Sequence, residues 1–203
     1  NGWAIVGGQG VNGSWAANTY EYIASMANHN GNIVVGLGST ANDAEVWEFN
    51  GTAWNQIGGD SLNSGWTTNY EEVTALASLD GQLYAGIGNT ANEAEVWRWN
   101  GSTWTKIADN ALNSWPANFE RVSSLTSYNG ELYAGTGASA GDAEVWRWNG
   151  SGWNKIGGDT VFGSWDLSNF EQVETLYSFN NKLYAGLGNS ADDAELWEWN
   201  GTV

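Results

Sequence analysis

One motif is repeated four times in this chain at an almost constant interval. Each copy begins with Glu, continues with Val-Trp or Leu-Trp, and ends with Asn-Gly, and the copies span residues 45–51, 95–101, 144–150 and 195–201. The first tryptophans of successive copies are 50, 49 and 51 residues apart. A repeat of this length is one supersecondary unit that cannot bury its apolar surface alone. The 203 residues are therefore expected to form a single domain of four stacked units.

The third copy shows what the unit contains. Its β-branched and aromatic runs predict four strands, at residues 119–128, 131–135, 143–148 and 153–156. Asn129-Gly130 joins the first two strands and Asn149-Gly150 joins the last two. Asn-Gly is a strong hairpin signal because a type I′ turn needs positive φ at both central residues. Each unit is therefore predicted to be a four-stranded antiparallel meander.

The apolar pattern indicates a sheet that is covered on both faces. Val122 and Leu125 are three residues apart in the first strand, so their side chains point to opposite sides, and every other repeat has apolar residues at both positions. A series of four-stranded sheets buried on both sides is typical of the blades of a β-propeller. The expected fold class is therefore all-β, a β-propeller with four blades per chain.

The expected blades span approximately residues 15–59, 66–109, 115–158 and 165–203. The last blade lacks a fourth strand, and the N-terminal residues 1–8 contain a matching one. The segment Trp3-Ala4-Ile5-Val6-Gly7-Gly8 aligns with Trp54-Asn55-Gln56-Ile57-Gly58-Gly59. We expect this N-terminal strand to complete the last blade, which would close the ring and remove its exposed edges.

The repeated phrases resemble those of known propeller families. Leu-Tyr-Ala-Gly, followed by a Val-Trp strand and a Trp-x-x-Ile strand, is most similar to Kelch-type and tectonin-type blades, and the resemblance covers the full length of the chain. It implies four-stranded blades and names no ligand. The chain departs from Kelch repeats because its paired glycines, such as Gly157-Gly158, follow the fourth strand instead of the second. It also lacks the Trp-Asp ending of a WD40 blade.

Two ring sizes fit the repeats. Four blades can close as a monomer, or two chains can form an eight-bladed homodimer in which each lends its N-terminal strand to the other. Repeats two and three are identical at 25 of 42 aligned positions, which suggests recent amplification or design and blades that tolerate different ring sizes. The sequence slightly favours the closed four-bladed monomer.

The best candidate for a ligand site is the set of loops between blades. In a propeller these loops emerge at the same edge as the loops between the second and third strands, and long loops on a rigid scaffold often carry binding residues. An aromatic ring can stack on a sugar, and Asn or Asp can bond its hydroxyl groups. The candidate carbohydrate-binding residues are Trp15, Trp66, Trp115, Trp165, Asp60, Asn110 and Asp159. The alternative is that the four tryptophans are buried wedges between blades.

Two sets of glutamates recur at equivalent positions. Glu21, Glu71, Glu120 and Glu171 begin the innermost strands. They could converge in the central channel and bind Ca²⁺ or another hard cation; the alternative is that each one caps backbone amides in its own loop. The second set begins the third strands and is expected to hydrogen-bond a neighbouring loop: Glu45, Glu95, Glu144 and Glu195.

Charge excludes several partners. The chain has 23 acidic and 6 basic residues and a net charge of −17. Such a surface repels nucleic acid and anionic membranes, and no apolar run reaches the length of a membrane span. Cations, carbohydrates and proteins with basic surfaces remain as partners. No cysteine is present, which excludes thiol chemistry and does not define the compartment.

Catalysis has little support in the sequence. His29 is the only histidine, and no spacing of carboxylates singles out a catalytic pair. We therefore expect a non-catalytic binding module, lectin-like with repeated weak sites that act together. The alternative is a structural or self-assembling scaffold without a ligand, either of designed blades or a fragment of a longer array.

Overall fold

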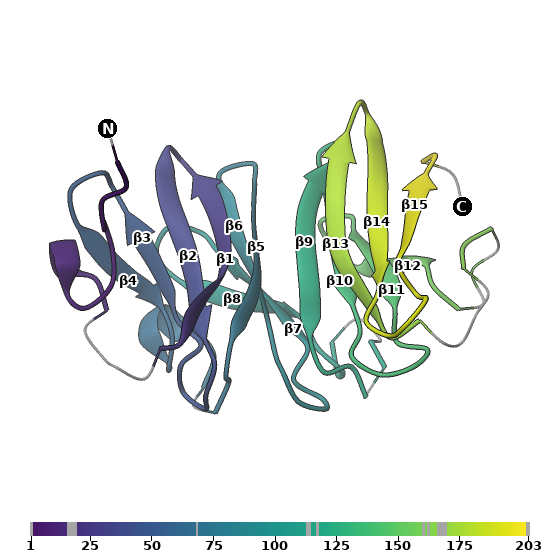
Figure 1. The fold of residues 1–203 in the computed structure, drawn as a ribbon, viewed down its shortest axis with the longest axis horizontal. Coiled ribbons are helices and arrows are strands. Elements are labelled where there is room, and N and C mark those ends of the chain that lie inside the picture. The colour runs from purple at the N-terminus through teal and green to yellow at the C-terminus, as the bar shows by residue number, and fades with distance from the viewer. Residues whose placement is uncertain are drawn as a thin grey trace.

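The computed structural model describes residues 2–15, 20–67, 69–112, 115–116, 118–159, 161, 163–165 and 170–201. Its strands form four antiparallel sheets that follow one another along the chain (Figure 1). Sheet 1 contains β1 (Tyr22–His29), β2 (Asn32–Gly38), β3 (Val46–Phe49) and β4 (Trp54–Gly58). Sheet 2 contains β5 (Val73–Leu79), β6 (Gln82–Ile87), β7 (Glu95–Trp99) and β8 (Trp104–Ala108). Sheet 3 contains β9 (Val122–Tyr128), β10 (Glu131–Thr136), β11 (Glu144–Trp148) and β12 (Trp153–Gly157). Sheet 4 contains β13 (Gln172–Phe179), β14 (Lys182–Gly188) and β15 (Glu195–Trp199).

Each sequence repeat has become one sheet. Within every sheet the strands pair in the order in which they occur, so each sheet is a meander. The innermost strands β1, β5, β9 and β13 lie beside one another in the middle of the molecule (Figure 1). This arrangement confirms the expected all-β fold of propeller blades.

Tight turns join the first and second strands of each sheet. Asn129 and Gly130, between β9 and β10, have φ values of 50° and 77°. Asp80 and Gly81 form the corresponding turn of sheet 2, with φ values of 50° and 71°. Positive φ at both residues is what a type I′ hairpin requires. These turns form the hairpin edge of the molecule, at the top of Figure 1.

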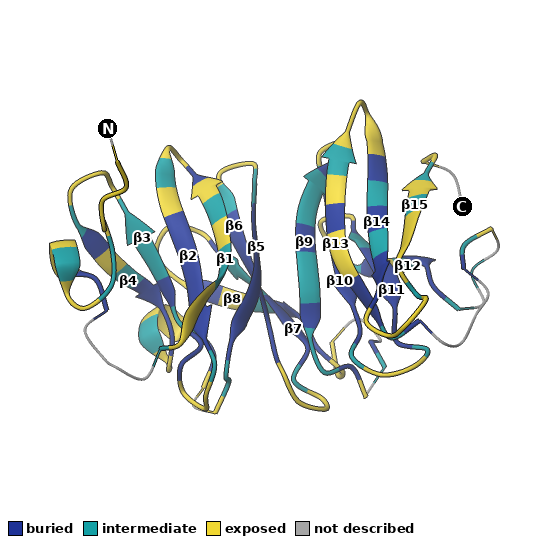
Figure 2. Ribbon diagram, in the orientation of Figure 1, coloured by how far each residue is buried: buried dark blue, intermediate teal, exposed yellow. Residues whose placement is uncertain are grey.

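Neighbouring sheets meet where a glycine of one faces a valine of the next. A Cβ built on Gly86 of β6 would lie 2.7 Å from Cγ1 of Val122, which begins β9. The same contact joins Gly36 to Val73. A side chain at either glycine would therefore separate the sheets. Apolar clusters fill all three junctions, and Figure 2 shows the buried residues gathered on the facing strands.

Tryptophans bond the outer strands across the same junctions. Trp104 Nε1 on β8 donates to the carbonyl oxygen of Ile57 on β4, at 2.8 Å. Trp153 Nε1 on β12 donates to the carbonyl oxygen of Ile107 on β8, at 3.1 Å. Both indoles are buried. The outermost strands of sheets 2 and 3 are thus each bonded to the outermost strand of the sheet before.

The N-terminal segment differs from the sequence prediction. It was expected to be the fourth strand of the last blade, yet in the part of the chain that the structure describes sheet 4 has three strands and residues 2–8 belong to no strand. The segment lies against sheet 1, where Trp54 Nε1 donates to the carbonyl oxygen of Val6 at 2.8 Å. Figure 1 places the N-terminus and sheet 4 at opposite ends of the molecule, so the described chain is an open arc. Residues 2–8 precede sheet 1 closely in the sequence and therefore lie beside it. Because the four sheets form an open arc, β15 lies at the other end of the molecule (Figure 1).

In the part of the chain that the structure describes, no helix is long and apolar enough to cross a membrane.

We expect the buried position of Leu132 to show how strongly the junctions stabilise the fold. Leu132 is 0% exposed at the junction of sheets 2 and 3, whereas Ile33, at the same position of sheet 1, is 47% exposed. Leu132→Ala should lower the free energy of unfolding by about 3 kcal/mol, because it leaves a cavity in a packed core. In dilute protein solution, Ile33→Ala should lower the free energy of unfolding by less than about 1 kcal/mol. Equal losses of unfolding free energy for the two variants, measured by urea denaturation, would contradict the finding that this face of sheet 1 is uncovered.

Candidate functional site

The loops between sheets gather at the edge opposite the hairpins, which we call the loop edge (Figure 1). Two of them contain short 3-10 turns, Val11–Gly13 and Leu62–Ser64. The loops between the second and third strands meet the following sheet at this edge. For example, the backbone N–H of Asn92 donates to the carbonyl oxygen of Phe119 at 3.0 Å. The loop edge is therefore held by bonds between blades, as a binding surface on a rigid scaffold would be.

The four loop tryptophans are structural. Trp15, Trp66, Trp115 and Trp165 are all buried. Trp66 Nε1 donates to the carbonyl oxygen of Ala44, and Trp165 Nε1 donates to that of Ala143, both at 2.8 Å. The rings also make edge contacts with other tryptophans, such as Trp66 with Trp97. The burial of these rings agrees with the alternative interpretation, in which they are wedges between blades. Stacking of a sugar on them stays a prediction.

The polar members of the predicted set lie at the surface of the loop edge. Asp60 and Asn110 are exposed and Asp159 is half-buried. They occupy equivalent positions just after β4, β8 and β12, and Gln9 follows the N-terminal segment in the same way. The repeated fold thus presents a hydrogen-bonding side chain at the same place on successive blades.

The predicted cation site does not assemble. Within the described residues no group of three or more His, Cys, Asp or Glu side chains is close enough together to hold a metal ion. The glutamates instead bond within their own blades. Glu71 accepts from Asn89 Nδ2 at 2.8 Å, Glu120 from Ser139 Oγ at 3.2 Å, and Glu171 from Ser190 Oγ at 2.9 Å. Glu21 is exposed at the open end of the arc.

Two glutamates of the second set, Glu95 and Glu144, form equivalent buried sites that the sequence pattern indicated only in part. Glu95 accepts a hydrogen bond from Trp97 Nε1 at 2.7 Å and pairs with Lys106 Nζ at 2.9 Å. Glu144 makes the same bonds to Trp146 and Lys155, at 2.9 and 2.7 Å. The partners are a tryptophan two residues away and a lysine on the adjacent strand, not the neighbouring loop that was expected. The period-two side-chain alternation of Glu-Val-Trp would have revealed the first bond.

Glu45 differs from Glu95 and Glu144 because no lysine accompanies it. Gln56 occupies the position of Lys106 and Lys155, and Trp47 Nε1 donates to Glu45 at 2.7 Å. Burial raises the pKa of the Glu45 carboxyl above its ordinary value of 4.5, against the hydrogen bonds that favour the ionised form. Burial, together with a hydrogen bond to Glu45, also raises the pKa of the Tyr20 phenol. The charge of Glu45 is therefore a local cost to stability at neutral pH.

Most of the basic side chains form ion pairs with carboxylates of the same chain. Three lysines and two arginines each have a carboxylate within 4 Å: Lys106, Lys155, Lys182, Arg121 and Arg147. Most of the remaining acidic residues belong to the loop edge or to the strand starts beside it. The loop edge therefore carries a negative field that the chain does not neutralise.

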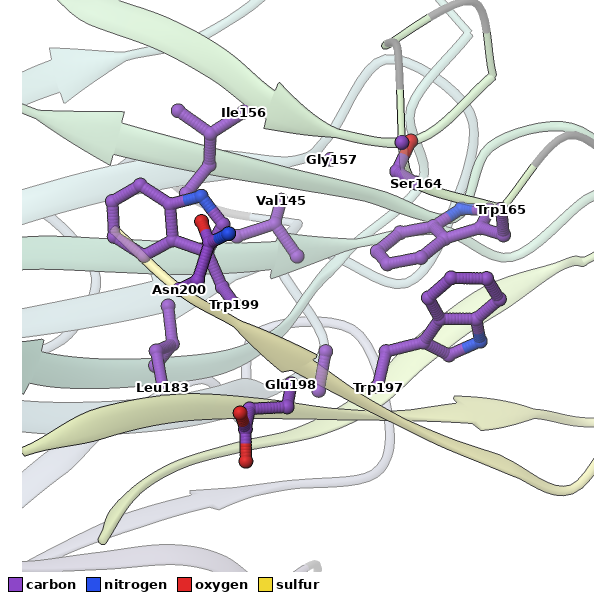
Figure 3. A pocket seen from close by; sticks show the side chains of 12 residues that line it. Val145, Ile156, Gly157, Ser164, Trp165, Leu183, Trp197, Glu198, Trp199 and Asn200 are labelled. Carbon is purple, nitrogen blue, oxygen red and sulfur yellow. The ribbon is translucent and has the colours of Figure 1, made fainter. Parts of the chain in front are cut away.

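The principal cavity of the described residues lies elsewhere, beside the third strand of sheet 4. It has a volume of ≈ 380 Å³. Figure 3 shows Trp165, Trp197, Trp199 and Ile156 around it, from the preceding loop, β15 and β12. It occupies the place that a fourth strand fills in the other sheets.

Comparison with known proteins supports the fold alone. No protein-family model matches the chain, and no curated protein matches its sequence. Solved structures do match. The extracellular domain of a hybrid two-component system from B. thetaiotaomicron has a TM-score of 0.59 at 15% identity, over 92% of this chain and 22% of that one.

Trypanosoma rangeli sialidase in complex with the inhibitor DANA has a TM-score of 0.59 at 13% identity, over 90% of this chain and 36% of that one. A Dyadobacter fermentans protein of unknown function has a TM-score of 0.59 at 11% identity, over 91% of this chain and 67% of that one. This chain thus spans about a fifth of the first structure and about a third of the second. The chain thus resembles a propeller-like run of blades, and the solved structures that share this fold are described as different kinds of protein.

We expect Glu45→Gln to stabilise the protein at neutral pH. The raised pKa means that the unfolded chain ionises more readily than the folded one, so the carboxylate costs stability above both pKa values. The gain in unfolding free energy should stay below about 1 kcal/mol, because solvent screens a half-buried group. It should fade as the pH falls through the raised value and vanish below 4.5.

The matched control is Glu95→Gln, which removes the ion pair with Lys106 and should lower the stability at pH 7. Thermal melts of both variants between pH 3 and pH 8 make the comparison. A loss of stability in Glu45→Gln at pH 7 would contradict the assignment.

Proposed function

We propose that this chain is a non-catalytic binding module whose loop edge engages a protein partner with a basic surface. The observation that carries the proposal is the repeated presentation of Asp60, Asn110 and Asp159 at equivalent places on a rigid, strongly acidic edge. Opposite charge across an interface accelerates association and selects partners. Equivalent sites on successive blades add avidity to weak single contacts.

A basic protein surface is favoured over a carbohydrate for a physical reason. Sugar recognition draws much of its energy from an exposed aromatic face. The indoles of the loop edge are buried, so its exposed side chains offer mainly hydrogen bonds and charge for recognition. A lectin-like role through Asp60, Asn110 and Asp159 alone is the second outcome that the experiment below distinguishes.

The surroundings of His29 support a role without catalysis. Its ring is buried, with Nδ1 2.9 Å from Ser78 Oγ and Nε2 3.0 Å from Asn30 Nδ2. Burial lowers its pKa. Both ring nitrogens are therefore engaged at the hairpin edge, away from the loop edge. The likeness to sialidases rests on 13% identity and carries no activity to this chain.

The test is binding of a fluorescent decalysine peptide, with a neutral glycan array as the alternative probe. The variant Asp60→Asn/Asp192→Asn removes two charges from the loop edge. Asn is compatible with the positive φ of 71° at Asp192, because Asn92 has φ of 73° at the equivalent place. We expect about a fivefold loss of peptide affinity, and weaker binding at high salt.

The matched control is Glu48→Gln/Asp80→Asn, which removes the same charge near the hairpin edge. It should leave peptide affinity within about twofold. Equal losses in both variants would reduce the effect to net charge and contradict the loop edge as the site. Binding to glycans that is insensitive to salt would replace the basic partner with a carbohydrate.

A further inference from the structure

The three junctions between sheets share the same set of contacts. A glycine of the second strand faces a valine of the next sheet, at Gly36–Val73, Gly86–Val122 and Gly135–Val173. Backbone N–H groups of each sheet donate to a carbonyl just before the next sheet. For example, Ala44 donates to Tyr70, and Ala143 to Phe170. We call the face of a sheet that points toward the next sheet along the chain its trailing face, and the face that points toward the preceding sheet its leading face. A junction is therefore a defined interface between the trailing face of one sheet and the leading face of the next.

The two ends of the arc carry the unpaired halves of this interface. The leading face of sheet 1 exposes Ile23, Met26 and Ile33. The trailing face of sheet 4 exposes Tyr177, Phe179 and Leu196. Leu196 is 73% exposed, whereas Val46, Val96 and Val145 occupy its position in the other sheets and are buried. Large apolar side chains exposed together indicate an interaction surface.

The surroundings of two glycines in sheet 4 also show that its trailing face is uncovered. A Cβ built on Gly186 would meet only Thr175 of its own sheet, with no valine of a following sheet nearby. One built on Gly188 would meet only Asp193 and Ala194, whereas the equivalent atom on Gly137 would contact Glu171 of the next sheet. The trailing face of sheet 4 is thus shaped for a leading face that the single chain does not supply.

The N-terminal segment is already placed as the last strand of a preceding sheet. Trp54 Nε1 donates to the Val6 carbonyl oxygen at 2.8 Å, just as Trp104 Nε1 donates to that of Ile57. A Cβ built on Gly7 would contact the indole of Trp54, as one on Gly58 contacts that of Trp104. Yet Trp3, whose counterparts Trp54, Trp104 and Trp153 are buried, is fully exposed.

The cavity of sheet 4 matches that exposed tryptophan. Trp153 packs between Trp115 and Trp148, and Trp104 packs between Trp66 and Trp99. In sheet 4 the corresponding pair is Trp165 and Trp199, and both line the empty space in Figure 3. Ile156 lines it too, and it corresponds to Ile107, whose carbonyl oxygen accepts the hydrogen bond from Trp153 Nε1. The cavity therefore has the lining that a fourth strand of sheet 4 would need, including a pocket for the tryptophan that begins such a strand. We call it the strand site.

We propose that the occupant is a second copy of this chain, whose residues 3–8 become the fourth strand of sheet 4. Its leading face then covers the trailing face of sheet 4. Two chains that exchange these segments form a closed ring of eight blades, in which both open sheet edges disappear. The argument for a second copy over closure within one chain is that the N-terminal segment and sheet 4 lie at opposite ends of the arc (Figure 1).

The repeat assigns the new contacts residue by residue. Trp3 Nε1 donates to the Ile156 carbonyl oxygen of the other copy, and Ala4 lies opposite Glu198, as Asn154 lies opposite Arg147. Ile23 packs on Gly186, as Val73 packs on Gly36. This assembly does not depend on the proposed function, because it uses the ends of the arc and not the loop edge.

A designed disulfide tests the pairing directly, because the chain has no cysteine of its own. In the variant Ala4→Cys/Glu198→Cys the two thiols face each other across the new strand pair. We expect a reducible covalent dimer at twice the 21.9 kDa chain mass under mild oxidation. The matched control is Arg98→Cys/Thr105→Cys, the same pair within sheet 2, which should link inside one chain.

Three outcomes overturn the proposal. A disulfide within the Ala4→Cys/Glu198→Cys monomer would show that the chain closes on itself. A ladder of larger species would show open polymers instead of a two-chain ring. Absence of any link, while the control pair forms, would show that the strand site is not occupied by these residues.

The substitution Trp3→Ala provides an independent measurement. By sedimentation velocity it should raise the dimer dissociation constant at least about 30-fold, as removal of a central interface tryptophan commonly does. The unfolding of the dilute monomer should not change, because Trp3 contacts solvent there. Leu112→Ala, which truncates an exposed apolar residue of the loop edge, is the control and should leave dimerisation unchanged. An unchanged dissociation constant for Trp3→Ala would contradict the strand site.

Discussion

The fold depends on how closely one sheet can approach the next at its innermost strands. Gly36, Gly86 and Gly135 have no side chain, and the valines of the following sheets occupy that space. Hydroxyl groups use the same closeness: Thr74 Oγ1 donates to the Val122 carbonyl oxygen, and Ser123 Oγ donates to that of Val173 at 2.6 Å. Because dispersion contacts weaken steeply with separation, a larger residue at these glycines would disturb the whole junction.

The tryptophans explain why the surface of the loop edge is polar. Their large apolar rings fill the space between blades. The Nε1 groups of Trp66 and Trp104 donate to backbone carbonyls, and that of Trp146 donates to the buried Glu144. A buried indole needs such a partner because an unpaired N–H is costly in an apolar interior. The same requirement fixes the glutamates that begin the third strands, which in turn hold Lys106 and Lys155. Recognition of a partner is thus left to the side chains outside this network.

The repeat also produces two incomplete ends. A linear array of identical units necessarily leaves one uncovered face at each terminus, and such faces must be capped or joined. Here the exposed residues at the two ends are large and apolar, as at Met26 and Leu196, so neither end is capped by polar side chains. The loop edge and the ends of the arc therefore serve separate purposes: one can bind a partner while the other joins chains.

The sequence by itself determined the unit of the fold. The spacing of the Trp motifs and the Asn-Gly turns predicted four meandering sheets, because local pairing and turn geometry are encoded within each repeat. The expectation that Val122 and Leu125 point to opposite faces was wrong, because a bulge between them turns both toward sheet 2. The equivalence of Trp3 to Trp54 was also visible, since it needs only alignment. Tertiary structure decided what the repeats do together. Whether Trp66 is exposed to a ligand, whether Glu71 meets its counterparts, and which sheet receives the N-terminal strand depend on curvature and on packing between blades. Those are properties of the stacked sheets, and no single repeat contains them.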